Sequence, residues 1–246
     1  MNKAVIITAR TSSKRLPSKI IKRVINNFRS IDIIIKRSQK INLPIILATS
    51  NTKKDDFLCR YIKKKYKILI FRGSNLNKIK RWYECFRKFK IDYGCIIDGD
   101  DILFDYEIYK REIHKKVGFE ILSHPKNMIT GLFTHIISFK TLSKMKFLFN
   151  KNIDTEMIEP FLKKAKVKKK ILRIKEKYRN KKIRLTLDYE EDYKLIKLLV
   201  KKFGCLVKSK KIVDFLIANK EIPKINFFRE NDWKKNQIIK INKSCI

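Results

Sequence analysis

Ala4-Val-Ile-Ile-Thr8 is a short run of apolar, mostly β-branched residues that leads directly into a polar and basic stretch. Such a run is typical of a buried parallel strand that ends in a loop. The same pattern recurs at Pro44-Ile-Ile-Leu-Ala48, Ile68-Leu-Ile-Phe71 and Gly94-Cys-Ile-Ile97. Stretches with helical spacing separate these runs, at residues 20–38, 53–66 and 76–90. The alternation predicts an α/β fold, a mostly parallel, twisted sheet flanked by helices.

The second half of the chain alternates less regularly. Further strands are expected at residues 119–122, 131–137 and 170–174, and further helices at 138–149, 154–165 and 192–202. No linker rich in Gly, Ser or Pro divides the sequence. We therefore expect one domain over residues 1–225, with an elaborated C-terminal half, followed by a basic tail at 226–246.

The composition describes a folded but very basic protein. Of its 246 residues 44% are hydrophobic, and 61 Lys and Arg against 24 Asp and Glu give a net charge of +37. This charge fits either a nucleic-acid partner bound through its phosphates or compositional drift over a solvated surface. We favour drift, and consider nucleic-acid binding the less probable reading, because the lysines are spread along the whole chain.

Several classes of protein are excluded on simple grounds. The five cysteines are scattered and form no C-x-x-C pair, so the sequence signals neither a zinc site nor a disulfide framework. No run reaches the roughly 18 apolar residues that a membrane span needs. The N-terminus lacks the pattern of a signal peptide. A cytoplasmic protein is expected.

The first loop, Arg10-Thr-Ser-Ser-Lys-Arg-Leu-Pro-Ser-Lys19, contains four cations and three serines. Backbone N–H groups, hydroxyls and cationic side chains together can bind the phosphates of a nucleoside triphosphate. The loop lacks the glycines and the spacing of a P-loop. A basic loop is also ordinary in so basic a chain, so this signal alone is weak.

Carboxylates follow the fourth apolar run at Asp98-Gly-Asp-Asp101 and recur in Arg184-Leu-Thr-Leu-Asp-Tyr-Glu-Glu-Asp-Tyr193. They suit Mg²⁺ held jointly by one or two carboxylates and by the phosphates of a substrate. A turn with helix-capping aspartates is the structural alternative. For Glu190 and Glu191 the stabilisation of a helix N-terminus is the better explanation. Asp188, at the end of an expected strand, is a candidate ligand.

The string ITARTSSKRLPSK, residues 7–19, resembles the opening signature of the cytidylyltransferases that activate acidic sugars. These are the acylneuraminate, deoxyoctulosonate and spore-coat polysaccharide enzymes. Further blocks agree in order and spacing, at residues 48–50, 71–74, 98–105 and 184–193. The resemblance covers residues 3–225 and is greatest to the spore-coat branch.

This resemblance implies a single Rossmann-like domain of the nucleotide-diphosphosugar-transferase type, expected as a homodimer. The implied reaction transfers CMP from CTP to an acidic sugar of the nonulosonic-acid type and releases pyrophosphate, for surface polysaccharide synthesis. On the family pattern Arg15, Lys19 and Asp100 are catalytic, and Asp100 and Asp188 hold Mg²⁺. The residues expected to bind CTP are Ala9, Arg10, Ser12, Ser13, Arg15, Lys19, Ala48, Ser50 and Arg72.

Some positions depart from the family pattern. Ser12 and Ser18 stand where the family commonly has glycine, and Ile102 replaces a proline expected soon after the metal-binding aspartate. Because the phosphate-binding cations and both aspartates are present, we expect an active enzyme.

The sequence says less about which residues bind the acceptor sugar. His124 is a candidate sugar contact or general base, although a histidine at a strand end is more often a hydrogen-bonding loop residue. The run 163–184 contains thirteen Lys and Arg. With few aromatic side chains for base stacking, it fits a solvated face better than a nucleic-acid-binding strip. Two alternative functions stay open: a nucleic-acid-binding protein on a nucleotide-binding scaffold, and a related nucleotidyltransferase with a non-sugar acceptor.

Overall fold

The computed structural model describes residues 1–13, 15–116, 118–151 and 153–244. The strands are β1 (Lys3–Thr8), β2 (Arg23–Ile25), β3 (Phe28–Arg29), β4 (Ile45–Ser50), β5 (Leu69–Gly73), β6 (Tyr93–Asp98), β7 (Ile121–Ser123), β8 (His135–Ser138) and β9 (Lys169–Ile171). The α-helices are α1 (Ser30–Gln39), α2 (Asp56–Lys65), α3 (Lys78–Lys88), α4 (Tyr106–His114), α5 (Phe139–Lys144), α6 (Glu159–Lys164), α7 (Glu190–Phe203), α8 (Ser209–Ala218) and α9 (Arg229–Ser244). Short 3-10 helices lie at Lys19–Ile21, Lys53–Asp55, Lys146–Leu148, Glu176–Tyr178 and Ile222–Ile225.

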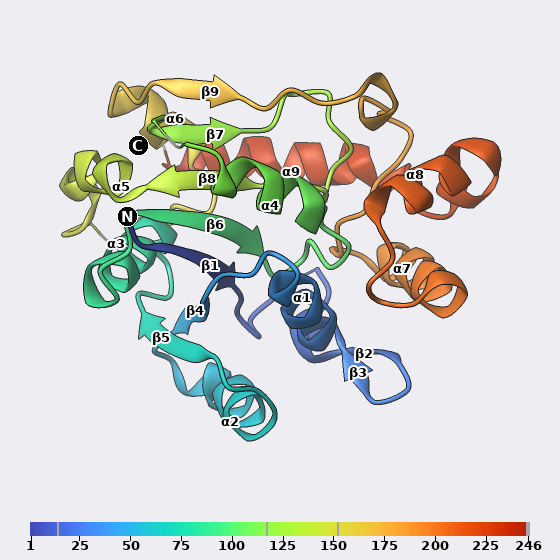
Figure 1. The fold of residues 1–246 in the computed structure, drawn as a ribbon, viewed down its shortest axis with the longest axis horizontal. Coiled ribbons are helices and arrows are strands. Elements are labelled where there is room, and N and C mark those ends of the chain that lie inside the picture. Colours follow the sequence, from blue (N-terminus) through green and yellow to red (C-terminus); the bar gives the residue numbers. More distant parts are fainter. Residues whose placement is uncertain (14, 117, 152, 245–246) are drawn as a thin grey trace.

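Within the described residues, seven strands form one sheet in the order β5-β4-β1-β6-β8-β7-β9 (Figure 1). β1 pairs in parallel with both β4 and β6, and β5 continues the parallel set beside β4. β8 is antiparallel to its neighbours β6 and β7, and β9 is parallel to β7. Since β8 alone runs against the other six strands, the predicted mostly parallel sheet flanked by helices is confirmed.

The core forms on both faces of this sheet because strand side chains alternate. Val5 and Ile7 of β1 point into an apolar cluster that includes residues of α1, α2 and α4. Ala4 and Ile6 point the other way, into a cluster built with α3, α5 and α6. Figure 1 shows α1 and α4 in front of the sheet and α9 passing behind it.

The expected helix over residues 20–38 is wrong in its first half. A small antiparallel hairpin of β2 and β3 precedes α1, which begins only at Ser30. Asn26 adopts φ 46° at the tip of this hairpin. Asparagine tolerates the left-handed conformation better than most residues, and paired turn residues favour a tight hairpin over a continuous helix.

Two expectations for the C-terminal half are also corrected. Residues 184–187, expected as a strand leading to Asp188, form only an isolated bridge, between Arg184 and Thr130. The segment expected as a basic tail at 226–246 begins with Asn226, which is only 1% exposed, and continues as α9 through Ser244. The tail expectation is wrong over this part because side chains of the segment pair with the domain. Residues 245–246 lie outside the described part of the chain.

None of the helices in the described residues is long and apolar enough to span a bilayer.

Candidate functional site

The loops that follow β1, β4, β5 and β6 lie at one edge of the sheet, because parallel strands end on the same side. The loops after β1 and β6 approach each other closely. The N–H of Gly99 donates to the carbonyl oxygen of Thr8 at 2.8 Å. A Cβ at Gly99 would lie only 2.9 Å from the Cβ of the buried Ala9. The basic loop and the aspartate cluster are therefore adjacent.

Four of the predicted site residues come together at this edge. Lys19 Nζ lies 3.0 Å from Asp100 Oδ2 and 2.8 Å from Asp188 Oδ1. The guanidinium of Arg15 donates to Asp188 Oδ1 at 2.5 Å. The N–H of Leu187 donates to the backbone carbonyl of Asp100 at 2.8 Å, which holds the two aspartates side by side. The structure thus joins three distant parts of the sequence in one charged cluster.

Ser18 turns the chain into the short helix that begins at Lys19. Its φ is 55°, in the left-handed region that favours glycine. The serine therefore keeps the backbone conformation that a glycine at this position would adopt, and the departure from the family pattern does not displace Lys19 from the carboxylates.

Burial and charge act in opposite directions in this cluster. The side chain of Asp188 is 0% exposed, and burial alone would raise the pKa of its carboxyl. Lys19 and Arg15 outweigh that effect and hold the pKa well below its usual value. Burial would lower the pKa of Lys19, but Asp100 and Asp188 raise it above its usual value. Both groups are therefore charged at neutral pH.

The neighbouring carboxylates have partners of their own. Lys78, the first residue of α3, donates to Asp98 at 3.3 Å. The hydroxyl of Thr134 donates to Asp101 at 2.9 Å, and burial together with nearby carboxylates raises the pKa of Asp101 well above its usual value. Asp105 accepts hydrogen bonds from backbone N–H groups in the first turn of α4 and is its N-cap.

The remaining polar residues of the first loop are placed differently. Arg10 extends to the loop after β5, where its guanidinium donates to the carbonyl oxygen of Asn75 at 2.6 Å. The hydroxyl of Ser13 accepts an N–H of its own loop at 3.3 Å, and Ser12 is exposed. Lys14, the fourth cation of the loop, lies outside the described residues.

The predicted nucleotide contacts beyond the first loop lie in the last residues of β4 and β5. Ala48 is fully buried in the core. The hydroxyl of Ser50 donates to Asp55 at 2.5 Å. Arg72 pairs with Asp56 at 2.7 Å and donates to the backbone of residues 50 and 52. These contacts stabilise the wall of the site beside the first loop.

Asp55 is a site residue that the sequence analysis missed. Its carboxylate accepts the N–H of Thr11 at 2.7 Å and the hydroxyl of Thr49 at 3.0 Å, and thereby ties the first loop to β4. Burial would raise the pKa of Asp55, but these hydrogen bonds lower it. An acidic side chain in the short polar segment after a buried strand, in so basic a chain, is the signal that could have identified it.

A second missed set surrounds Asp188. The guanidinium of Arg184 donates to Asp188 Oδ2 at 3.1 Å and is itself paired with Asp192 and Glu230. Arg184 and Asp192 stand in the block that carried the resemblance, without an assigned role. Glu230 lies 46 residues beyond Arg184, and local sequence carries no sign of that contact.

The region expected to meet the acceptor contains two histidines. The exposed His124 stacks on His135, with ring centroids 6.1 Å apart. His135 is buried and its Nδ1 lies 3.2 Å from the hydroxyl of Ser123. Burial, followed by the charge of His124, lowers the pKa of His135 well below its usual value.

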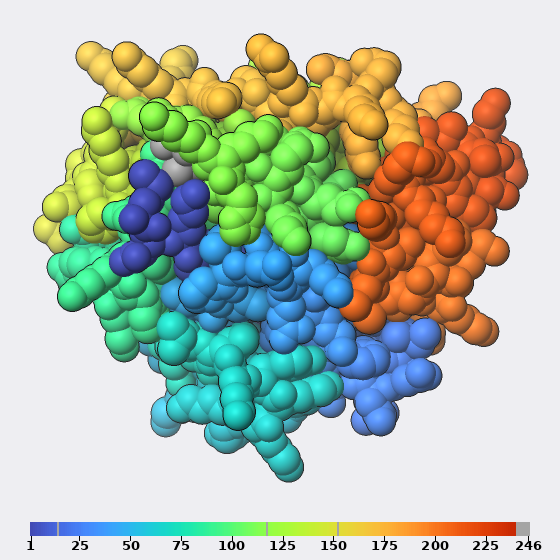
Figure 2. Space-filling model, viewed as in Figure 1, coloured from blue at the N-terminus to red at the C-terminus, as the bar shows by residue number. Residues whose placement is uncertain are grey.

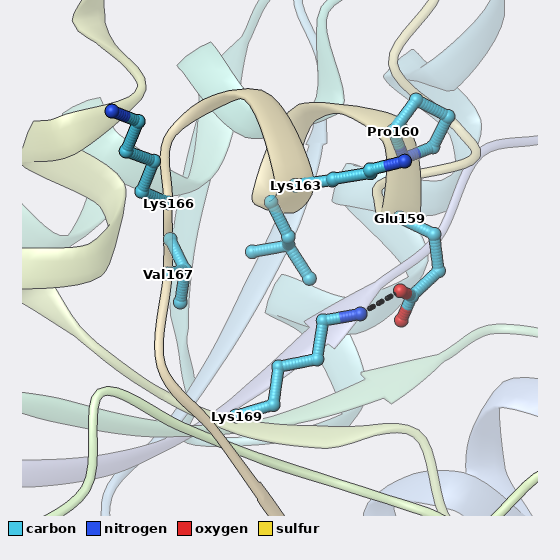
Figure 3. A pocket seen from close by; sticks show the side chains of 7 residues that line it. Glu159, Pro160, Lys163, Lys166, Val167 and Lys169 are labelled. Atoms are coloured by element: carbon cyan, nitrogen blue, oxygen red, sulfur yellow. Dashed lines mark hydrogen bonds and ion pairs between the residues drawn. The ribbon is translucent and has the colours of Figure 1, made fainter.

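Two hollows lie elsewhere on the surface. The larger, of about 550 Å³, is formed by α6 and the segment leading into β9, where Lys169 pairs with Glu159 (Figure 3). The other, of about 440 Å³, lies between β2 and α7. Neither contains a predicted site residue. The basic run 163–184 passes along the upper edge of the molecule in Figure 2, coloured yellow to orange, and its lysines at 163, 166 and 169 are exposed.

The donor set fits a small hard cation that also binds phosphate. Among the residues that the structure describes, no group of three or more His, Cys, Asp or Glu side chains is arranged to hold a metal. Asp100 and Asp188 instead supply two carboxylates that converge on one point, the position of Lys19 Nζ. One or two carboxylates completed by the phosphates of a substrate are a common Mg²⁺ site.

Comparisons with known proteins show the family of the chain. Residues 4–212 match a family described as Cytidylyltransferase. An uncharacterized protein of Methanocaldococcus jannaschii is 29% identical over 227 residues, which cover 90% of this chain and 93% of that protein. The spore coat polysaccharide biosynthesis protein SpsF of Bacillus subtilis is 28% identical over 81% of this chain and 86% of its own length. A solved cytidylyltransferase structure from Leptospira borgpetersenii superimposes with a TM-score of 0.79 at 22% identity, over 90% of this chain and 96% of that one.

Proposed function

The chain belongs to the cytidylyltransferase family, and from that premise we propose that it transfers CMP from CTP to an acidic sugar, with Mg²⁺, and releases pyrophosphate. The observation that carries the proposal is the meeting of Arg15, Lys19, Asp100 and Asp188 at the carboxyl edge of the sheet. The name of the Bacillus relative supports a role in surface polysaccharide synthesis. The resemblance of residues 7–19 to enzymes that activate acidic sugars supports that acceptor class.

In this proposal the first loop binds the triphosphate, through Arg10, Ser13, Arg15 and Lys19. Arg15 and Lys19 lie against Asp188 in the structure, so phosphate oxygens would take the place of carboxylate oxygens as their partners. The positive charge is kept in place and stabilises the charge that develops on the departing pyrophosphate.

Asp100 and Asp188 would hold Mg²⁺. When bound, the ion supplies positive charge beside the reacting phosphate. The low pKa of Asp188 keeps its carboxylate ionised, so this side chain can accept a cation without first losing a proton.

The nucleoside would lie between the first loop and the end of β4, near Ala9. Ala48 and Ser50 are fully buried, so in this proposal they shape that wall from beneath rather than contact the base directly. Ser12 and Arg72 stay predictions as further CTP contacts. The acceptor oxygen must be placed in line with the α-phosphorus, and His124 is the candidate contact on that side. The homodimer implied by the resemblance is a prediction that light scattering of the purified protein tests.

Calorimetric titration with CTP, ATP, GTP and UTP tests the proposal, each with Mg²⁺ at about 0.15 M salt, where surface charge is screened beyond about 8 Å. We expect a clear preference for CTP. Equal and salt-sensitive binding of all four nucleotides would contradict the proposal and favour the nucleic-acid alternative.

Asp100→Asn is expected to lower pyrophosphate release by about 100-fold or more while the protein stays folded, because it removes one of the converging carboxylates. Asp105→Asn is the matched control. It changes a carboxyl five positions along the same stretch, and asparagine also caps helices well, so near wild-type turnover is expected. Unchanged turnover in Asp100→Asn would refute the assignment of the metal site.

A further inference from the structure

A chain of buried charges links Asp188 to the C-terminal helix α9. The guanidinium of Arg184 donates to Asp188 Oδ2 at 3.1 Å. It also donates to Asp192 Oδ1 at 3.0 Å and to Glu230 Oε2 at 2.9 Å. The side chain of Arg184 is 1% exposed and that of Glu230 is 16% exposed. An unpaired charge at such positions is strongly unfavourable, so each group depends on its partners.

The two carboxylate oxygens of Asp188 have different partners. Oδ1 faces Arg15 and Lys19, the cations at the phosphate end of the site. Oδ2 is held by Arg184. Because Arg184 fixes Oδ2, the carboxylate cannot rotate freely, and it presents a single oxygen to the site.

Arg184 is held in turn from two sides. Asp192 accepts two of its N–H groups and also the backbone N–H of Asp188, and it is fixed by the amide of Asn226 at 2.8 Å. Glu230 accepts a hydrogen bond from the remaining terminal nitrogen of the Arg184 guanidinium. Asn226 and Glu230 both lie beyond residue 212, where the match to the family ends.

We propose that Glu230 is a positioning residue of the active site. By holding Arg184 it fixes the orientation and the effective charge of Asp188, so that the C-terminal segment completes the phosphate end of the site. This inference rests on the proposed function for the identity of the nucleotide.

Loss of Glu230 leaves the guanidinium of Arg184 with one carboxylate fewer. Its positive charge then acts more strongly on Asp188, which becomes a poorer partner for a cation. We expect the Kd for a magnesium–phosphate ligand to rise about tenfold, because a full charge is removed at a partly buried position.

The test is calorimetric titration of the full chain with Mg²⁺–CTP and, separately, with Mg²⁺–pyrophosphate. Glu230→Ala is expected to weaken both by about tenfold. Glu230→Gln should recover part of the affinity, because its amide oxygen can still accept from Arg184 but carries no charge. The loss should depend on Mg²⁺ concentration, which a merely structural effect would not produce.

Glu191→Gln is the matched control. Glu191 of α7 pairs with Arg229 of α9 at 2.9 Å, so this variant likewise breaks an ion pair made by α9, but one that does not include Arg184. Its affinity for both ligands is expected to equal that of the wild type. Thermal unfolding of all three variants tests whether each is folded.

The outcomes separate the two proposals. Wild-type affinity in Glu230→Ala, or an equal loss in Glu230→Ala and Glu191→Gln, overturns the positioning role. A wild type that binds Mg²⁺–pyrophosphate without preferring CTP overturns the proposed function, and the pyrophosphate titration still decides the role of Glu230. A wild type that binds neither ligand overturns both.

Discussion

Lys19 reaches two carboxylates that lie 81 and 169 residues further along the chain. The residues that meet here were predicted from the family resemblance, and for Lys19 and Asp100 also from their place in loops at one edge of a parallel sheet. Asp188 reaches the same place although the strand expected before it is not formed. The partners of these residues could not be predicted. Glu230 acts through a hydrogen bond formed only after distant segments pack, and nothing in the local sequence specifies that contact. The place of Asp55 after a buried strand marks it as a candidate, but its bond to Thr11, 44 residues away, could not be read from the sequence.

The buried His135 gives a prediction about stability at the scale of one residue. Burial, with a smaller contribution from the charge of His124, holds the pKa of His135 well below its usual value. The folded state therefore disfavours the protonated ring. Above about pH 6.5 the ring is neutral in both states and costs the folded protein nothing. As the pH falls from there towards the lowered pKa, the unfolded state takes up the proton first, so the free energy of unfolding decreases.

We expect the wild type to lose about 1 kcal/mol more unfolding free energy between pH 6.5 and 5.5 than His135→Gln, which has no ring to protonate. Urea unfolding at the two pH values measures this. Parallel pH profiles for the two proteins would show that the pKa of His135 is the same in the folded and unfolded states.

At the scale of elements, a glycine positions the segment that carries Asp188. Gly131 has φ 96°, and a Cβ there would lie 2.5 Å from the carbonyl carbon of Leu185. The adjacent Thr130 accepts the N–H of Leu185 at 2.9 Å. This contact replaces the strand that was expected at 184–187.

Gly131→Ala is expected to destabilise the fold by about 3 kcal/mol, because it combines backbone strain with a clash against backbone atoms. Denaturant unfolding measures the change. Gly118→Ala is the control, since nothing lies within 4 Å of a Cβ at that position, and it should change stability by less than about 1 kcal/mol. Similar values for the two variants would count against this account.

Elements with a simple burial pattern could be predicted, and those set by a single turn could not. β1, β4 and β6 are inner strands of the sheet with mostly buried side chains, so each appears in the sequence as an apolar run. β5 lies at the edge of the sheet and is only partly buried, but its run of apolar residues was also recognisable. The hairpin of β2 and β3 depends on one left-handed residue, Asn26. α9 was mistaken for a tail because its polar composition conceals ion pairs with residues far upstream.

At the scale of the whole molecule, the net charge of +37 opposes the compact state. Much of the basic surface, including the exposed lysines of the run 163–184, faces solvent. Charges of one sign held on a folded domain repel one another more strongly than in an expanded chain. Electrostatic screening should therefore favour folding.

We expect the midpoint of thermal unfolding to rise by several degrees between about 0.01 M and 0.1 M NaCl, as the screening length falls from about 30 to 10 Å. Differential scanning calorimetry measures it, and KCl should act like NaCl because the effect depends on ionic strength. A midpoint that falls would mean that the surface ion pairs contribute more than the general repulsion does.

The position of Lys19 between Asp100 and Asp188 has a consequence for the order of events on the enzyme. Before any ligand arrives, the site already holds its own counter-ion at the point where a metal would bind. A bare divalent ion would have to displace the ammonium group of Lys19 from both carboxylates without offering it a new anionic partner. A nucleotide that brings the ion with it offers that ammonium group a phosphate in exchange. If the proposed site is right, the resting protein should favour the intact metal–nucleotide complex over its separate components, and substrate loading is expected to be a single concerted exchange of partners.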